Sequence, residues 1–193
     1  MVGIVAGIGS LLFTAVATYY AAAVSKDQLD QSREDAIREE RDQAARVAAW
    51  VETDRAGSMR VHLMNRSLDP VSAVALSFWV SFPDRLLSSR WVYVLYSQPV
   101  VSVGPCTELV FDQGSMEYVS WVDGFRSQKK VPSRGLYADV IRVEFMDRTG
   151  VKWVRDRKGL DRVTGSFGPV DRHGRALGLV EGRPTSKEAS SCR

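Results

Sequence analysis

The side chains that could perform acid–base chemistry are few in this chain. It contains two histidines, His62 and His173, and a hydrolase of the triad type needs such a base beside a nucleophile and an orienting acid. No Gly-x-Ser-x-Gly sequence marks a nucleophilic serine, and neither Cys106 nor Cys192 has the neighbours of a reactive thiol. We therefore predict no catalytic residues, although either histidine could serve a site assembled from distant parts of the sequence.

Metal and cofactor sites have equally little support. Histidine, cysteine and acidic residues do not cluster at the short spacings of metal ligands. No Gly-x-x-x-x-Gly-Lys phosphate loop occurs. With two cysteines and no Cys-x-x-Cys, the chain has no disulfide framework, which favours a reducing compartment. We expect neither a bound metal nor a cofactor.

One group of basic residues could bind an anion. Four residues of a predicted surface loop at 126–134 are basic: Arg126, Lys129, Lys130 and Arg134. Such a loop is a candidate contact for anionic lipid or nucleic acid, and a plain solvated loop is the alternative. The formal net charge of only +3 adds nothing in favour of nucleic acid, so we do not expect nucleic acid to be the partner.

The elements that would position these groups begin with an uncharged run, residues 2–24. As a helix this run would extend about 34 Å, and the hydrocarbon core of a bilayer is about 30 Å thick. Residues 1–24 are therefore predicted to form a transmembrane helix. Three alternatives remain open: a cleaved signal peptide, a dinucleotide-binding loop that contains Gly7 and Gly9, and a buried core helix.

Flanking charges predict the orientation of this helix. Lys26 and several arginines follow the run and no basic side chain precedes it, so the positive-inside rule places the rest of the chain in the cytoplasm. Gly3 and Gly7 have the Gly-x-x-x-Gly spacing at which two membrane helices pack closely. This spacing predicts a homodimer face, with ordinary small-residue content as the alternative.

Residues 25–56 are predicted to form a charged helical stalk that continues from the first helix. Residues 25–51 contain neither Gly nor Pro, and Glu34 and Arg38 have the helical i,i+4 spacing of an ion pair. A weak apolar stripe that includes Leu29 and Ile37 leaves two interpretations open, a coiled-coil dimer or a single helix that acts as a spacer.

After Gly57, helical spacing ends and alternation of apolar and polar residues begins. The predicted strands are residues 60–65, 71–81, 91–96, 108–111, 117–122, 138–146 and 152–155. Because no helical pattern separates them, residues 57–160 are predicted to form a β-sandwich of two packed sheets. Its predicted core includes the tryptophans Trp79, Trp91, Trp121 and Trp153. Residues 161–193 are rich in Gly and Arg, and we predict a partly disordered tail.

Two stretches resemble known proteins. Residues 61–67, followed by Pro70 and Val71, resemble the Asn-x-Ser, Pro-Val opening of many immunoglobulin-like sandwich modules. Residues 143–156 resemble the Phe-x-Asp-x-x-Gly-x-x-Trp-x-Arg hairpin of uncharacterised actinobacterial membrane-anchored proteins. The resemblances imply an immunoglobulin-like fold and a bacterial source, and they carry no catalytic residues.

The predicted function follows from this layout. We expect a single-pass protein of the cell membrane whose mainly-β domain lies in the cytoplasm and binds another protein without catalysing a reaction. One alternative is an enzyme or enzyme subunit whose site is not visible in the sequence. Another is a binder of anionic lipid or nucleic acid through the basic loop 126–134.

Overall fold

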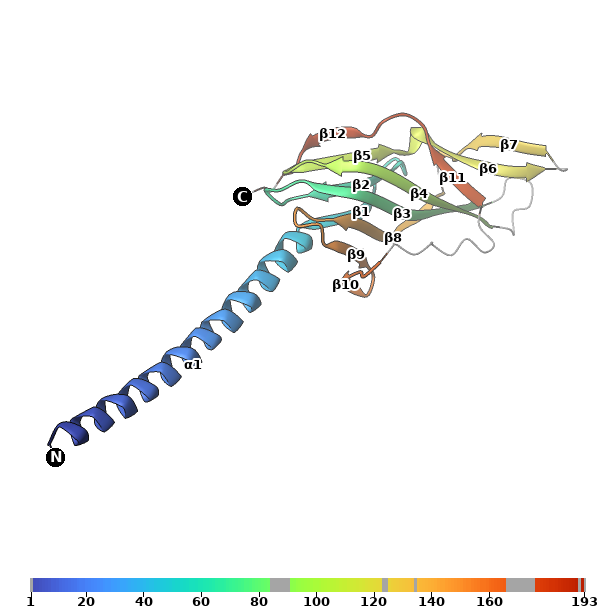
Figure 1. Ribbon diagram of the computed structural model, residues 1–193. Coiled ribbons are helices and arrows are strands. Elements are labelled where there is room, and N and C mark those ends of the chain that lie inside the picture. The colour runs from blue at the N-terminus through green and yellow to red at the C-terminus, as the bar shows by residue number, and fades with distance from the viewer. Residues whose placement is uncertain are drawn as a thin grey trace. The chain divides into compact units, whose positions relative to one another are not determined.

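The computed structural model describes residues 2–83, 91–122, 125–133, 135–165, 176–190 and 192. The chain divides into two compact units, Met1–Asp42 and Gln43–Arg193. The elements, labelled in Figure 1, are α1 (Val2–Ala45), β1 (Val47–Thr53), β2 (Met59–Asn65), β3 (Val71–Pro83), β4 (Trp91–Val103), β5 (Thr107–Asp112), a short 3-10 helix (Gln113–Ser115), β6 (Met116–Val122), β7 (Phe125–Lys130), β8 (Tyr137–Met146), β9 (Lys152–Asp156), β10 (Gly159–Arg162), β11 (Ala176–Val180) and β12 (Thr185–Glu188).

The helix α1 is stabilised along its charged part by ion pairs one turn apart. Arg38 lies 3.7 Å from Glu34, and Arg33 lies 3.6 Å from Asp30. The Glu34–Arg38 pair expected from the sequence is thereby confirmed. Because these side chains are exposed, each pair contributes only about 0.3 to 0.5 kcal/mol.

The prediction of a transmembrane helix at residues 1–24 is wrong. Where its residues are described, α1 has no stretch that is long and apolar enough to cross a bilayer. The described structure does not support the coiled coil either; side chains 16–39 of the single chain are all exposed. Gly3 and Gly7 lie in α1 where side chains are not described, so a dimer face there stays a prediction.

The helix ends earlier than the predicted stalk, residues 25–56. The Arg46 N–H donates to Gln43 O at 3.1 Å and closes the last turn. The chain then enters β1, which pairs antiparallel with β2. Val47 is fully buried in the sandwich, so long-range packing of the β-branched residues Val47 and Val51 outweighs the helix propensity of the neighbouring alanines.

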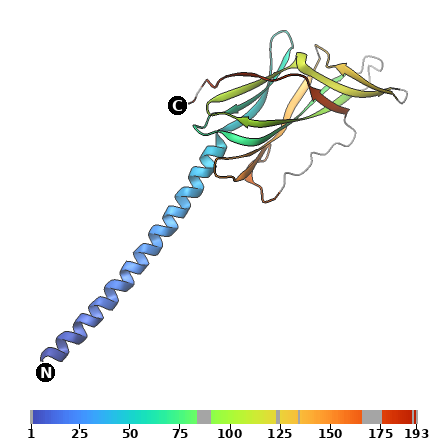
Figure 2. The ribbon, with the colours of Figure 1, turned by 45° about the horizontal axis from the view of Figure 1, so that its top comes forward.

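The predicted β-sandwich is confirmed. One sheet has the strand order β1-β2-β5-β12, and the other has the order β10-β9-β8-β3-β4-β11-β6-β7 (Figures 1 and 2). Each of the predicted strand segments falls within a strand of the structure. Described neighbours pair antiparallel, except that the short strand β11 runs parallel to β4.

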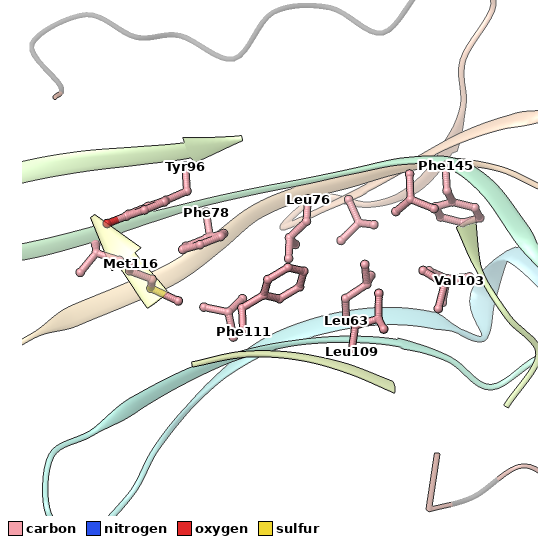
Figure 3. Close-up of a cluster of buried hydrophobic side chains, with 14 of the residues drawn as sticks. Leu63, Leu76, Phe78, Tyr96, Val103, Leu109, Phe111, Met116 and Phe145 are labelled. Atoms are coloured by element: carbon pink, nitrogen blue, oxygen red, sulfur yellow. The ribbon is translucent and has the colours of Figure 1, made fainter. Parts of the chain in front are cut away.

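The core lies between the two sheets, where inward-facing residues of both interdigitate (Figure 3). Phe111 of the smaller sheet and Phe78 of the larger are fully buried or nearly so. The rings of Phe78 and Tyr96 stack with centroids 4.7 Å apart. A Cβ on Gly178 would lie 2.3 Å from Tyr96 Cε1, so β11 can cover the Tyr96 ring only with glycine at this position.

The tryptophan prediction holds at one position and fails at another. Trp153 is buried, with 4% of its surface exposed, whereas Trp91 is 41% exposed. Trp79 is half-buried on β3, and the side chain of Trp121 lies outside the described residues. Strand alternation explains the difference, because Trp91 and Trp79 point to the outer face of their sheet while Trp153 points inward.

The tail that was predicted to be partly disordered contains two strands among its described residues. Within residues 161–193, β11 pairs with β4 and β6, and β12 pairs with β5. Cys192 forms a disulfide with Cys106, although the sequence favoured no disulfide. These short segments gain order from their neighbours, so their own glycine-rich composition does not predict it.

Candidate functional site

Of the four predicted anion-binding residues, the structure describes the side chains of Lys129 and Lys130 only, so an anion site there stays a prediction. Lys129 and Lys130 are exposed on β7, so this part of the predicted loop is a strand. Lys130 stands opposite Glu117 in the ladder, and the Glu117 carboxylate accepts a hydrogen bond from Gln128. The side chain of Arg126 and the whole of Arg134 lie outside the described residues.

His62 is held on the outer side of the smaller sheet with only 2% of its surface exposed. Its Nδ1 lies 2.6 Å from Glu108 Oε1, and its Nε2 lies 3.0 Å from Glu52 Oε2. The Trp50 ring stacks on the imidazole with centroids 4.8 Å apart. A general base needs a nitrogen within reach of a substrate proton. Nδ1 of His62 is bonded to Glu108, whereas Nε2 lies near Glu52 but makes no hydrogen bond among the described residues; the contact of the ring with Trp50 supports the tryptophan side chain. His173 lies outside the described residues.

Glu108 holds this cluster together from the neighbouring strand. Its Oε1 accepts from His62 and lies 3.1 Å from Lys187 Nζ of β12. Burial alone would raise the pKa of Glu108, but the hydrogen bonds from His62 and Lys187 outweigh burial and hold that pKa below its ordinary value. The ionised carboxylate therefore stabilises the folded state.

We expect Glu108→Gln to lower the free energy of unfolding by about 1 to 3 kcal/mol at neutral pH, because a buried charge-assisted hydrogen bond is lost. Since the folded pKa is the lower one, the wild-type advantage is complete above about pH 4.5 and declines as the pH falls through the folded pKa. Urea unfolding of wild type and Glu108→Gln, near neutral pH and near pH 3, measures the difference in unfolding free energy at each pH. Glu188→Gln, an exposed change on β12, is the control, and a difference that does not vary with pH would contradict this assignment.

An open cleft of about 410 Å³ lies between β1 and β8. The apolar part of its lining comes from β1 and β8 and includes Trp50, and charged groups make up a comparable part. The charged residues at the cleft are Asp139, Arg155, Asp156 and Arg157. Ligand sites in proteins typically have volumes of about 300 to 1,000 Å³ and combine apolar walls with a few polar groups. This cleft has that composition.

Three of the four charged residues at the cleft are already engaged. Asp139 forms an ion pair with Arg157. Asp156 Oδ1 accepts hydrogen bonds from the backbone N–H groups of Lys158 and Gly159, at 2.7 and 3.3 Å, and thereby shapes the turn after β9. Arg155 is the remaining charged residue of the lining, and its guanidinium has no carboxylate partner among the described ion pairs.

Arg155 donates from Nη2 to the backbone oxygen of Ala45 at 2.9 Å. Its Nε–H is buried and has no acceptor among the described residues, and the described ion pairs give it no carboxylate. Burial lowers the pKa of Arg155, and the positive charge of Arg66 lowers it further. A buried donor without an acceptor costs about 1 to 3 kcal/mol, so this guanidinium favours binding of an anion.

Arg155 was read from the sequence only as the end of a strand. A signal was present, because strand alternation places Arg155 on the same inward face as Trp153. An arginine at an inward position requires acceptors. The opposite side of the cleft was not visible, because residues 47–53 were assigned to the helical stalk.

Comparison of the chain with protein-family models, with curated proteins and with solved structures finds no match. The fold therefore defines the class of this protein by itself. It is a mainly-β sandwich domain that follows a long helix.

Proposed function

We propose that the β-sandwich is a non-catalytic binding domain, with the β1–β8 cleft as its ligand site and Arg155 as the residue that binds a carboxylate of the ligand. The observation that carries this proposal is the buried Nε–H of Arg155, which has no acceptor in the described structure. A carboxylate matches the planar fork of a guanidinium and accepts two parallel hydrogen bonds from it. The bond to Ala45 O fixes the direction of the fork before a ligand arrives.

The remaining lining indicates an apolar group next to that carboxylate. Trp50 borders the cleft, and its ring is braced by the stacked His62. His62 is in turn held between Glu108 and Glu52. This support fixes an aromatic ring on the outer face of β1 beside the cleft at low entropic cost, which is the property that makes tryptophan effective at binding surfaces.

An immunoglobulin-like arrangement of the sandwich supports a binding role. The neighbours β1-β2-β5 in one sheet and β9-β8-β3-β4 in the other follow the A-B-E and G-F-C-C′ strand orders of such domains. Domains with this architecture present their edges and loops to other molecules. Since fold does not establish function, the proposal depends on the chemistry of Arg155.

Binding of phenylacetate to the full chain tests the proposal, with phenylacetamide as the uncharged probe of equal shape. We expect phenylacetate to shift the Arg155 Nε–H signal in a ¹H–¹⁵N NMR titration and to bind at least about tenfold more tightly than the amide, a difference of about 1.4 kcal/mol. Arg155→Gln should remove this preference. Arg183→Gln, at an exposed position outside the cleft, should preserve it.

Two results would overturn the proposed function. One is equal binding of phenylacetate and phenylacetamide. The other is a set of NMR chemical-shift changes that centres on residues away from β1 and β9. Thermal unfolding of Arg155→Gln shows whether that variant is folded, and the comparison of the two probes on the wild-type chain stands even if it is not.

A further inference from the structure

The strand β1 is the edge of the smaller sheet, and among the described strands it pairs only with β2. Edge strands that must not bind other chains are usually protected by charged residues or proline. The β1 segment from Val47 to Val51 carries neither. Its outer edge is therefore suited to pairing with another strand.

The ladder shows which backbone groups of β1 face outward. The Arg66 N–H donates to Arg46 O at 3.1 Å, and these residues stand opposite each other one step beyond the first described pair. In an antiparallel ladder, hydrogen-bonded pairs alternate with non-hydrogen-bonded pairs. Even-numbered residues of β1 therefore direct their N–H and C=O toward β2, whereas Val47, Ala49 and Val51 direct theirs away from it.

Two of these outward-facing residues, Ala49 and Val51, line the cleft. The acceptor for Arg155 is the backbone oxygen of Ala45, the last residue of α1, two positions before β1 begins. The Arg155 guanidinium therefore lies near the start of β1 and lines the same cleft as Ala49 and Val51. Backbone hydrogen-bonding groups of β1 and an anion-binding group thus border one cleft.

The opposite side of the cleft also lacks a strand among the described residues. The pairing of β8 with β9 stops at Arg142 opposite Asp156, although β8 begins at Tyr137. Residues 138–140 border the cleft in this stretch, which pairs with β3 on one side and not with β9 on the other. The cleft is therefore open along its length beside the β1 edge.

We propose that the ligand is an extended segment of a partner polypeptide, which adds to the β1 edge as a further strand and places one carboxylate on Arg155. This inference rests on the proposed function and specifies its ligand class. Main-chain hydrogen bonds to Ala49 and Val51 supply affinity that does not depend on sequence. Arg155 selects segments with an acidic residue at one position, and Trp50 contacts an apolar neighbour.

Three acetylated and amidated hexapeptides test this inference on the full chain. The first is Thr-Val-Glu-Val-Thr-Val, the second has Gln in place of Glu, and the third carries N-methyl groups on alternate amides of the first. We expect the first to slow hydrogen exchange at the Ala49 and Val51 amides. The Gln peptide and the N-methylated peptide should each bind at least about tenfold more weakly, because one loses the charge and the other loses its strand edge.

A variant pair isolates the β1 edge. Ala49→Pro removes an outward N–H that takes no part in the ladder, so the fold can accept it, and the acidic peptide should lose at least about tenfold in affinity. Ser186→Pro is the matched control on β12, the opposite edge of the sheet. The bond from Ala189 N to Cys106 O fixes that ladder's alternation and directs the Ser186 N–H outward. Its peptide affinity should not change.

The outcomes separate this inference from the proposed function. If the N-methylated peptide binds as well as the first while the Gln peptide remains weak, strand addition is overturned and carboxylate binding stands. Binding of phenylacetate without binding of any peptide also overturns strand addition. If phenylacetate and the acidic peptide show no preference over their uncharged counterparts, the proposed function itself fails.

Discussion

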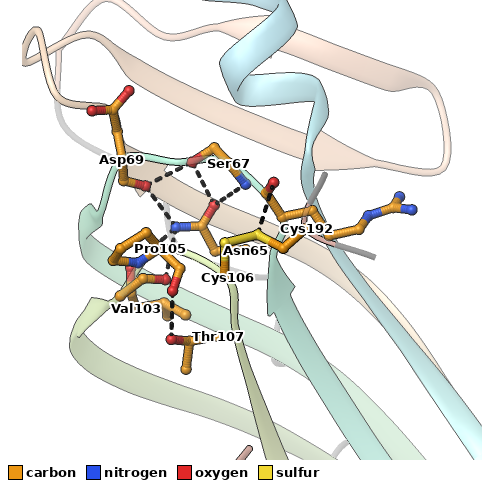
Figure 4. The surroundings of a disulfide bond; sticks show 10 residues. Asn65, Ser67, Asp69, Val103, Pro105, Cys106, Thr107 and Cys192 are labelled. Atoms are coloured by element: carbon orange, nitrogen blue, oxygen red, sulfur yellow. Dashed lines mark hydrogen bonds between the residues drawn. A yellow bond between two sulfur atoms is a disulfide. The ribbon is translucent and has the colours of Figure 1, made fainter. Parts of the chain in front are cut away.

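Replacing Cys106 and Cys192 together with serine is expected to lower the free energy of unfolding by roughly 4 to 5 kcal/mol. The two cysteines form a disulfide with their Cα atoms 5.3 Å apart and a sequence separation of 86 (Figure 4). In the chain-entropy account, a cross-link that closes so long a loop removes many conformations of the unfolded chain. Typical domains have only about 5 to 15 kcal/mol of stability, so the double variant should be close to unfolding at body temperature.

Unfolding in guanidinium chloride measures this loss of free energy. The slope of the free energy against denaturant concentration provides a second observation. The slope should increase in the variant, because an unfolded chain without the cross-link exposes more surface. Wild-type protein in reducing agent should match the variant, and Ser190→Ala, next to the same segment, should behave like oxidised wild type. A loss below about 1 kcal/mol would show that the disulfide does not constrain the unfolded chain as the entropy account requires.

This disulfide also affects the prediction of the cellular compartment that was drawn from the cysteines. The reducing compartment was predicted from their small number, and the bond between them removes the basis for that prediction. Disulfides persist in oxidising compartments and are rare in the cytosol. The bond therefore favours an oxidising environment for the β-sandwich.

The strands that the sequence predicted correctly are those that carry their signal locally. Residues 143–156 are an example, because alternation marks both strands and the turn between them has its own chemistry. Asp147 Oδ1 accepts from the N–H groups of Thr149 and Val151 at 2.9 Å, and Gly150 adopts a φ of +85°. Trp153 Nε1 donates to Asp147 Oδ2 at 2.8 Å. Each of these residue types was informative without knowledge of the fold.

The features that the sequence did not reveal depend on partners far along the chain. The segment Val47–Thr53 follows a helix directly, and alanines within it satisfy either pattern, so only pairing with β2 makes it a strand. β11 and β12 are short and acquire order from β4, β5 and β6. The cleft could not be predicted for the same reason, because it lies between β1 and β8, and the sequence of neither strand indicates that the two lie close together.

Replacing Asn65 with alanine is expected to cost roughly 3 to 5 kcal/mol of unfolding free energy. Asn65 is fully buried at the end of β2. Its Nδ2 donates to Asp69 O at 2.8 Å, and to Val103 O and Gly104 O at 3.2 and 3.0 Å (Figure 4). Its Oδ1 accepts from the N–H and the hydroxyl of Ser67 at 3.0 and 2.7 Å. One amide thus joins the turn before β3 to the turn after β4, and alanine leaves several buried groups unpaired.

Urea unfolding of three variants distinguishes the contribution of the Asn65 donor, Nδ2, from that of its acceptor, Oδ1. Asn65→Asp keeps an acceptor for Ser67 but places a charge beside backbone carbonyls, so it should cost at least as much as alanine. Ser67→Ala should cost only about 1 kcal/mol, because it removes the hydroxyl and leaves the Ser67 N–H bond in place. If Asn65→Ala cost no more than Ser67→Ala, the carbonyls of Val103 and Gly104 would have to find other donors, and the proposed role of Asn65 would be wrong.

The disulfide and Asn65 stabilise the same corner of the sandwich, and this proximity predicts how their effects combine. The Cys106 N–H donates to Ser67 O at 3.2 Å, so the turn that Asn65 organises is bonded directly to the disulfide segment. Interacting sites deviate from additivity by about 0.5 to 3 kcal/mol. Asn65→Ala should therefore cost less in the chain that lacks both cysteines than in wild type. Strict additivity would show instead that the amide network and the cross-link act on separate parts of the fold.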